Sequence, residues 1–414
     1  MWVAMLTVAS RLVNALKEIA IAYRFGATEM VDAYVLVFAF VTWLPAVWLS
    51  LLQTVFVPQA VRMNEDERED FVAELFGWVI VAGAFASVLL AVGLPELVLV
   101  LTPAHPGADE LRAFAWQMAP VALLGLVTSQ LIALLVIEKK HNNALLEGVP
   151  GALILILVVW QGSVLVLGLG TLAGFALQVA VALALLAPRG MRGPRLSTSA
   201  PSWRRFLGAV RIAAIGQLLL ALAYPVDQLI ANTMDAGDAA RFAYAYRLVA
   251  FVMAIGSLAI GRVVLPVLSE WDYEKSWQIT SDWALRVVLL GVTMAVGAWL
   301  VAPWLVQLLF ERGAFTSADS EVVTSVFRYG LLQIPALFAG VLLTQFLASR
   351  EAYLPISVIA AMGALTKIVL SVGLGMAFGL EGLMIASALA YVLTAVLSLL
   401  AARRMNLRRG GWGR

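Results

Sequence analysis

The sequence has no cysteine and only two histidines in 414 residues. Disulfides, thiol chemistry and cysteine-ligated metals are therefore excluded. The histidines, His105 and His141, fall in loops expected on opposite sides of a membrane, so we expect no metal site. No G-x-x-x-x-G-K loop ending in Ser or Thr is present, which argues against an ATP site. Charged residues are scarce, at 13%, and nothing in their pattern suggests a nucleic-acid partner.

Hydrophobic residues are abundant instead: they make up 62% of the chain, and the mean hydropathy is +0.92. Apolar runs of about 20 residues, long enough to span a bilayer as helices, recur along the whole sequence. We therefore predict an all-α polytopic membrane protein with twelve transmembrane helices. The expected spans are 2–25, 31–58, 72–101, 110–137, 144–162, 168–187, 207–233, 240–268, 282–309, 320–348, 354–379 and 382–401.

Lysine and arginine are distributed unequally over the loops between these spans. The opposite loops hold little beyond Arg241 and Arg312. The richer side holds Arg62, Arg68, Lys139, Lys140, Arg189, Arg192, Arg195, Arg204, Arg205, Lys275, Arg350, Arg403, Arg404, Arg408, Arg409 and Arg414. Cytoplasmic loops carry the excess of basic residues, so both termini are predicted in the cytoplasm. We read the arginine run over 189–205 as a topology signal and a contact for anionic lipids.

A polar stripe interrupts the first hydrophobic helix. At about 100° per residue, Ser10, Asn14, Lys17 and Arg24 fall on one face, with Arg11 and Glu18 at its edge. A cation this deep in a membrane helix costs about 2.5–3.5 kcal/mol, so such groups usually face a water-filled cavity. The stripe predicts a transport cavity with a positive lining, and hence an anionic substrate.

The two halves of the chain resemble each other. Gly26 leads to Asp32-Ala33-Tyr34 in the first half, and Gly237 leads to Ala243-Tyr244 in the second. Six helices per half give both repeats the same orientation, and substrate sites in such folds lie between the halves. We predict a six-helix lobe over 1–187, a cytoplasmic linker over 188–206, a second six-helix lobe over 207–401 and a basic cytoplasmic tail over 402–414.

These segments resemble the MurJ (MviN) lipid II flippase family, within a superfamily that includes MATE and Wzx-type exporters. The matching segments are Ser10-Arg11, Lys17-Glu18, Phe25-Gly26-Ala27, Asp32-Ala33-Tyr34, Phe56-Val57-Pro58, Tyr244-Ala245-Tyr246-Arg247-Leu248, Leu265–Ser269, Leu309–Thr316, Ala348–Glu351 and Gly379–Leu383. The resemblance implies two lobes around a V-shaped cationic cavity. It also implies transfer of a polyprenyl-diphosphate-linked saccharide from the inner to the outer leaflet by alternating access.

Matching positions carry four candidate residues over from the family: Arg11, Lys17, Asp32 and Arg247. The chain also departs from the family pattern. A basic pair of the second helix aligns near Pro45 and Ala46, an acidic residue is replaced by Ala250, and an Asn is replaced by Lys367. The family's last two helices, which form a lipid-accommodating groove, have no counterpart among the twelve expected spans. Twelve spans are typical of Wzx-like exporters, so the cargo is lipid II or a polysaccharide repeat unit.

We take five basic residues as candidates for binding the diphosphate in the cavity: Arg11, Lys17, Arg24, Arg247 and Lys367. Guanidinium groups bind phosphate oxygens in pairs, whereas Lys acts as a point charge. Arg24 has an alternative role as an interfacial residue, and Arg247 as a structural ion-pair partner of Asp227.

Three acidic residues are candidates for gating or ion coupling: Glu18, Asp32 and Asp227. For Asp227 a coupling-ion or proton site and a purely structural role remain open. Transport is expected to need no cofactor, with Na⁺, H⁺ or the membrane potential as the driving force.

The leading interpretation is a lipid-linked saccharide flippase of the bacterial cytoplasmic (inner) membrane, and a transporter, not an enzyme. We expect a monomer that meets membrane lipids and the enzymes of envelope synthesis. The first alternative is a MATE-like ion-coupled exporter of small organic molecules, for which an acidic or aromatic cavity is expected. A membrane glycosyltransferase would need larger outer loops, and a non-transporting scaffold would not need a cation such as Lys367 inside a helix.

Overall fold

In a computed structural model, residues 2–102, 107–138, 143–161, 163–187 and 192–410 are described, and these residues form helices and turns without a strand. The helices are α1 (Trp2–Phe25), α2 (Glu29–Leu51), the π-helical turn η1 (Leu52–Phe56), α3 (Val57–Ala60), α4 (Glu65–Leu101), α5 (Ala108–Met118), α6 (Pro120–Ile137), α7 (Asn143–Leu146), α8 (Val149–Gln161), α9 (Val164–Leu186), α10 (Ser202–Ala231), α11 (Asp238–Glu270), α12 (Tyr273–Phe310), α13 (Ser317–Leu331), α14 (Ile334–Ser349) and α15 (Tyr353–Gly410).

The twelve expected spans all have helical counterparts. Within the described residues, nine helical segments are long and apolar enough to cross a membrane. The segment over α15 counts once, although Gly379 has a non-helical backbone (φ 63°) that divides it where two spans were expected. The other two spans correspond to α1, which carries charges along its length, and to α8, which has 13 residues. The prediction of an all-helical polytopic membrane protein is confirmed.

The chain forms two compact units. The first comprises Met1–Ala240 and Arg312–Thr316, and the second comprises Arg241–Glu311 and Ser317–Arg414. Helix α10 lies in the first unit because it packs against α2. The predicted division into two six-helix repeats, joined by the linker over 188–206, describes an internal duplication of the sequence. The two units are defined by contacts in the fold, so they do not test that duplication, and it stays a prediction.

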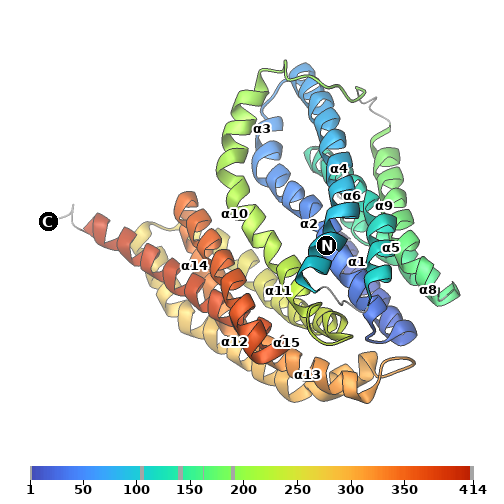
Figure 1. Cartoon of the computed structure of the whole chain (residues 1–414). Helices are drawn as coiled ribbons and strands as arrows, with labels where there is room; N and C mark the ends of the chain where they lie inside the picture. Colours follow the sequence, from blue (N-terminus) through green and yellow to red (C-terminus); the bar gives the residue numbers. More distant parts are fainter. Residues whose placement is uncertain (1, 103–106, 139–142, 162, 188–191, 411–414) are drawn as a thin grey trace. The chain divides into compact units, whose positions relative to one another are not determined.

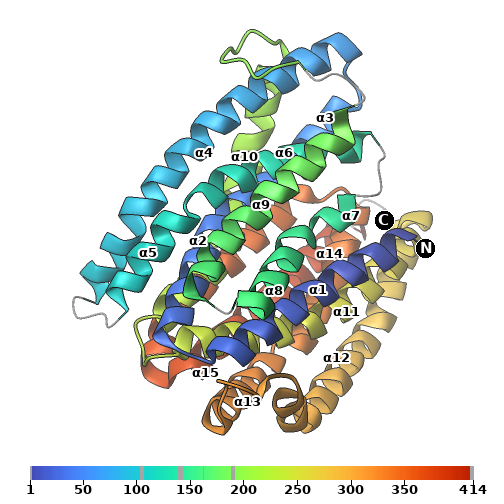
Figure 2. The same cartoon turned by 90° about the vertical axis from the view of Figure 1, so that its right-hand side faces the viewer.

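In the first unit, α6 packs against α2, α4 and α9, and Figures 1 and 2 show these helices side by side. Aromatic side chains join the start of α10 to this group. Phe206 is buried, and its ring centroid lies 5.4 Å from that of Phe71 on α4 and 6.5 Å from that of Phe56 in η1. The ring centroid of Trp48 on α2 lies 6.3 Å from that of Phe206, so edge-to-face ring contacts join α10 to α2, η1 and α4.

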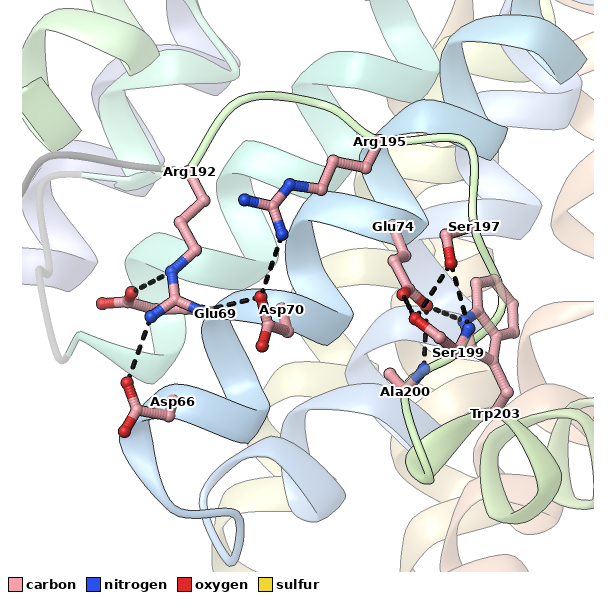
Figure 3. A network of polar contacts seen from close by, with 10 residues as sticks. All are labelled: Asp66, Glu69, Asp70, Glu74, Arg192, Arg195, Ser197, Ser199, Ala200 and Trp203. Atoms are coloured by element: carbon pink, nitrogen blue, oxygen red, sulfur yellow. Dashed lines mark hydrogen bonds and ion pairs between the residues drawn. The ribbon is translucent and has the colours of Figure 1, made fainter.

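The linker between the expected lobes lies along the first turns of α4 (Figure 3). Arg192 pairs with three carboxylates of that helix: Asp66 at 3.1 Å, Glu69 at 3.0 Å and Asp70 at 2.6 Å. The hydrogen bond to Asp70 raises the pKa of Arg192 above its ordinary value, so its charge is retained. Arg195 pairs with Asp70 at 3.3 Å. Arg192 and Arg195 therefore pair with carboxylates of the protein, and their contact with anionic lipids stays a prediction.

Further along the linker, Glu74 of α4 is a second anchoring point. Its carboxylate accepts hydrogen bonds from the hydroxyl of Ser199 (2.6 Å), the indole N–H of Trp203 (2.6 Å) and the backbone N–H of Ala200 (3.2 Å), as Figure 3 shows. The backbone N–H of Arg195 donates to the Ala73 carbonyl at 2.9 Å. A Cβ at Gly77 would collide with the Arg195 carbonyl, so this approach requires glycine.

In the second unit, α12 packs against α13 and α14, and α15 packs against α13 and α14. Arg350, just after α14, ties the end of α11 to the start of α12. Its guanidinium donates to the carbonyls of Leu268 (3.1 Å), Trp271 (3.0 Å) and Asp272 (3.1 Å). These contacts satisfy carbonyls at a helix C-terminus, where a cation is also favoured by the helix dipole. Arg350 therefore has a structural role in this unit.

Candidate functional site

Lys17, near the middle of α1, is buried and ion-paired. Lys17 is 4% exposed and Glu18 is 6% exposed. The Lys17 ammonium lies 2.6 Å from the Glu18 carboxylate. The ammonium also lies 5.0 Å from the ring centroid of Phe38 on α2, a distance at which a cation is attracted to the ring. The structure thus brings together one predicted binding residue and one predicted gating residue.

The rest of the stripe on α1 divides between two environments. Ser10 and Asn14 pack against the turn before α8, where the Asn14 amide donates to the Glu147 carbonyl at 3.3 Å. A Cβ at Gly148 or Gly151 would press against these two side chains, so the glycines allow a close approach of the helices. Placing the whole stripe on a cavity was therefore wrong for Ser10 and Asn14. Arg11 and Arg24 are exposed.

Asp32, in the first turn of α2, binds the start of α11. Its carboxylate accepts hydrogen bonds from the backbone N–H of Gly237 (2.5 Å) and of Ala240 (2.7 Å). The first N–H groups of a helix lack partners within the helix, and a carboxylate there also meets the positive end of the helix dipole. Asp32 therefore acts as an N-terminal cap, supplied from a helix more than 200 residues away in sequence.

The loop after α12 contacts the turn between α1 and α2. The backbone N–H of Ala314 donates to the Tyr23 carbonyl at 2.9 Å. Gly26 and Gly313 both have positive φ, 66° and 62°, and a Cβ on either would collide with backbone atoms of the other segment. Both segments match the family pattern, but no spacing or motif in the sequence indicates that they touch.

The remaining candidates are spread over both units. Asp227, on α10 of the first unit, is 1% exposed and lies one residue from Gln228, whose amide donates to the Tyr224 hydroxyl at 2.9 Å. Arg247 on α11 and Lys367 on α15 belong to the second unit and are half-buried. Their roles stay predictions.

The ion pair between Arg241 and Asp319 was not predicted from the sequence. Arg241, in the first turn of α11, donates from Nε to Asp319 at 2.9 Å, and its Nη lies 2.8 Å from the same carboxylate. Both guanidinium nitrogens contact the same oxygen, Oδ1 of Asp319, which is 5% exposed, so this buried, charge-assisted contact joins the starts of α11 and α13. Arg241 was noted in the sequence only as a charge in an outer loop, and no spacing links it to Asp319. Among the described residues no acidic or histidine cluster suited to a metal ion occurs.

The fold is shared with solved transporters. A structure described as lipid II flippase MurJ in an inward closed conformation matches with a TM-score of 0.86 at 17% identity, covering 97% of this chain and 87% of that chain. An inward-facing multidrug resistance MATE family transporter of the MOP superfamily matches with a TM-score of 0.80 at 14% identity, covering 99% and 100%. These likenesses define the class: a multi-pass helical protein with the fold of MurJ and MATE transporters.

The family model described as lipid II flippase MurJ matches residues 21–411. The chain belongs to the lipid II flippase MurJ family. Curated relatives carry the name "Probable lipid II flippase MurJ". That of Thermotoga maritima is 24% identical, covering 92% of this chain and 80% of its own, and that of Buchnera aphidicola is 21% identical, covering 88% and 75%. That of Bdellovibrio bacteriovorus is 26% identical over 55% of this chain, and the match spans 45% of the relative.

Proposed function

We propose that the protein is a flippase that moves a polyprenyl-diphosphate-linked saccharide from the inner to the outer leaflet by alternating access. The observation that carries this proposal is the family match over residues 21–411, in a chain whose membrane helices also hold basic residues. The relatives' names refer to lipid II. A diphosphate is the part of such a cargo that needs cations inside the membrane, because its charge is costly to bury alone.

The Lys17–Glu18 pair suggests how the cargo is recognised. The Lys17 ammonium lies 2.6 Å from the Glu18 carboxylate, so its charge is neutralised when no cargo is bound. A diphosphate carries the same sign of charge as the Glu18 carboxylate and competes for the ammonium. In this proposal Glu18 yields Lys17 to the diphosphate, and Arg11, Arg24, Arg247 and Lys367 supply further positive charge. Glu18 and Asp227 are the candidates for coupling to H⁺ or Na⁺, beside the membrane potential as a driving force.

The sugar part of the cargo stays open between lipid II and a polysaccharide repeat unit. The positions that align with the family's basic pair are Pro45 and Ala46, and Pro45 is buried in α2, where the Ser129 hydroxyl donates to its carbonyl at 3.0 Å. That segment therefore offers packing and no charge. We propose that Lys367 provides a compensating cation. The proposed setting is a bacterial cytoplasmic membrane, with a monomer working beside envelope-synthesis enzymes.

The test uses the purified full chain in detergent and in liposomes with a labelled polyprenyl-diphosphate saccharide. Lys367→Ala is expected to weaken binding about tenfold, since a charge-assisted contact contributes about 1.5–3 kcal/mol. Lys275→Ala is the matched control, because Lys275 is exposed and lies over the Trp271 ring at 3.1 Å from its centroid. Equal binding by both variants and the unchanged protein would remove Lys367 from the site. If the unchanged protein neither binds nor moves the lipid, the proposed flippase function is contradicted.

A MATE-like exporter of small organic molecules remains the second candidate. It is favoured by the MATE transporter structure, which this chain covers over its full length. Ion-driven efflux of an organic cation dye from the same liposomes tests it. Dye efflux without movement of the lipid would replace the flippase proposal with this one.

A further inference from the structure

A groove lies between α12 and α13, entirely within the second unit. Trp299, Pro303 and Gln307 follow one another at four-residue steps on one face of α12, and Glu311, which caps the helix, continues this spacing. The facing side of the groove is lined by α13 and the residue after it, and includes Ser317, Ser320, Glu321, Arg328 and Leu332. Together they enclose a cavity of about 810 Å³, a size typical of ligand sites.

A second, apolar pocket continues this groove. It has a volume of about 270 Å³ and shares Trp299, Arg328 and Leu332 with the first cavity. Its other lining residues are Val292, Ala295, Val296, Leu331 and Pro335. The groove is therefore polar at the end near Glu311 and Ser317 and apolar further along both helices. This graded polarity matches an amphiphile, whose headgroup and chain need different surroundings.

Arg328 lies where the polar and apolar parts meet. Its Nε donates to the Trp299 carbonyl at 3.2 Å, and its guanidinium carbon is 4.2 Å from the Trp299 ring centroid. Among the described residues this is its one hydrogen bond, although a guanidinium carries five donors. Side chains on a helix lean toward its N-terminus, so Arg328 reaches toward the polar cavity. Its remaining donors are available for an anionic group there.

The polar end of the cavity holds groups of the opposite charge and one orphaned hydroxyl. Glu321 is exposed and Glu311 is half-buried, so two carboxylates line this end. Ser320 is 6% exposed, and its Oγ has no hydrogen-bond partner among the described residues. A buried hydroxyl without a partner is costly, and a bound polar ligand would supply that partner.

The outer surface of α12 is apolar and exposed, as expected of a helix that contacts lipid. Only 11% of its most apolar window is buried, and Leu300, Trp304 and Leu308 are exposed. A ligand entering this groove therefore comes from the bilayer. The end with Glu311 is the one that the loop charges predict on the non-cytoplasmic side, so the neighbouring leaflet is the outer one.

We propose that this groove binds a glycerophospholipid with a primary ammonium headgroup. The phosphate lies on Arg328, the ammonium lies between Glu311 and Glu321, and an acyl chain follows the apolar pocket. The order of charges in the groove is the reason for choosing this class of lipid. In such a lipid the phosphate is next to the glycerol and the ammonium is outermost. The groove presents its cation beside the apolar part and its carboxylates at the far end. An anionic lipid without an amine would place no positive charge against the two carboxylates.

The test is native mass spectrometry of the intact, full-length protein titrated with single lipids in detergent. The lipids are dioleoyl phosphatidylethanolamine, phosphatidylcholine, which has no ammonium N–H, and phosphatidylglycerol, which has no ammonium. The unchanged protein is expected to bind phosphatidylethanolamine most tightly. Arg328→Gln is expected to weaken that binding about tenfold or more, since a charge-assisted contact is lost. Glu321→Gln is expected to reduce the preference over phosphatidylglycerol.

Arg112→Gln is the matched control, because Arg112 is an exposed arginine expected on the same side of the membrane and does not line the groove. It is expected to leave lipid binding unchanged. Equal affinity for the three lipids, unchanged binding by Arg328→Gln, or no bound lipid would overturn the proposal. If Arg328→Gln elutes as an aggregate, Arg328→Lys and the surface change Glu321→Gln decide in its place. Binding is read without transport, so a failed flippase assay leaves this outcome unaffected.

Discussion

At the scale of single residues, the charges inside the helices are held by specific partners. Lys17 is paired with Glu18 on the same helix, and the Asp32 carboxylate accepts hydrogen bonds from the backbone N–H groups of Gly237 and Ala240 at the start of α11. Both arrangements lower the cost of burying a charge. Charge in a membrane helix therefore does not by itself identify a substrate site. The contribution of each charged residue to the stability of the fold has to be measured.

The Lys17–Glu18 pair is expected to show strong coupling. Lys17→Met removes one partner of a buried ion pair, which typically costs about 3–5 kcal/mol. The double change Lys17→Met with Glu18→Gln is expected to recover most of that loss, because no ionised partner is left in the apolar surroundings. Thermal unfolding in one fixed detergent measures both. Losses that simply add in the double variant would show that the two side chains do not depend on each other.

The contact of Asp32 with α11 is expected to stabilise the protein in the way of a helix cap. Asp32→Ala removes the acceptor for Gly237 and Ala240 and is expected to cost about 1 kcal/mol. Glu29→Ala is the matched control, since Glu29 is an acidic residue in the same first turn of α2. The midpoints of thermal unfolding compare the two. A loss of the same size for both would contradict the capping role.

At the scale of elements, the linker is fixed along α4 by a close approach that only glycine allows. Gly77→Ala places a Cβ against the Arg195 carbonyl and is expected to displace the linker from the helix. Hydrogen exchange at Arg195 and Ala200 should then become faster, since their N–H groups are bonded to Ala73 and Glu74. Gly93→Ala is the control in the same helix, where the nearest atom, Cδ1 of Leu89, lies 3.5 Å away. Unchanged exchange in Gly77→Ala would show that the linker is not held in this way.

The helices could be predicted from the sequence, whereas their partners could not. Long apolar runs are local signals, so the twelve spans followed from run length and loop charge alone. The stripe on α1 gave the right face but not its neighbours: Asn14 meets the Glu147 carbonyl, while Lys17 meets Glu18. Periodicity cannot distinguish a face that packs on another helix from a face that meets water.

Contacts between distant segments were also beyond the sequence. Asp32 caps a helix that begins more than 200 residues later, and Arg192 finds its carboxylates on α4. No spacing rule relates such positions. The number of arginines in the linker is visible in the sequence, whereas the carboxylates with which Arg192 and Arg195 pair depend on the fold.

At the scale of the whole molecule, the chain has the fold of solved transporters, belongs to the lipid II flippase MurJ family and carries basic residues in its membrane helices. The first two are findings. The central claim is that a protein with this fold and family moves a lipid-linked saccharide. Lys17 and Lys367 are proposed to bind the diphosphate of that lipid.

The most direct measurement of that claim follows the leaflet of a labelled polyprenyl-diphosphate saccharide in liposomes that contain the purified chain. A reagent confined to the outside reports how much of the lipid has crossed. The account predicts crossing that requires the protein and slows in Lys367→Ala but not in Lys275→Ala. Crossing at the rate of protein-free liposomes, under an ion gradient and a membrane potential, would contradict it.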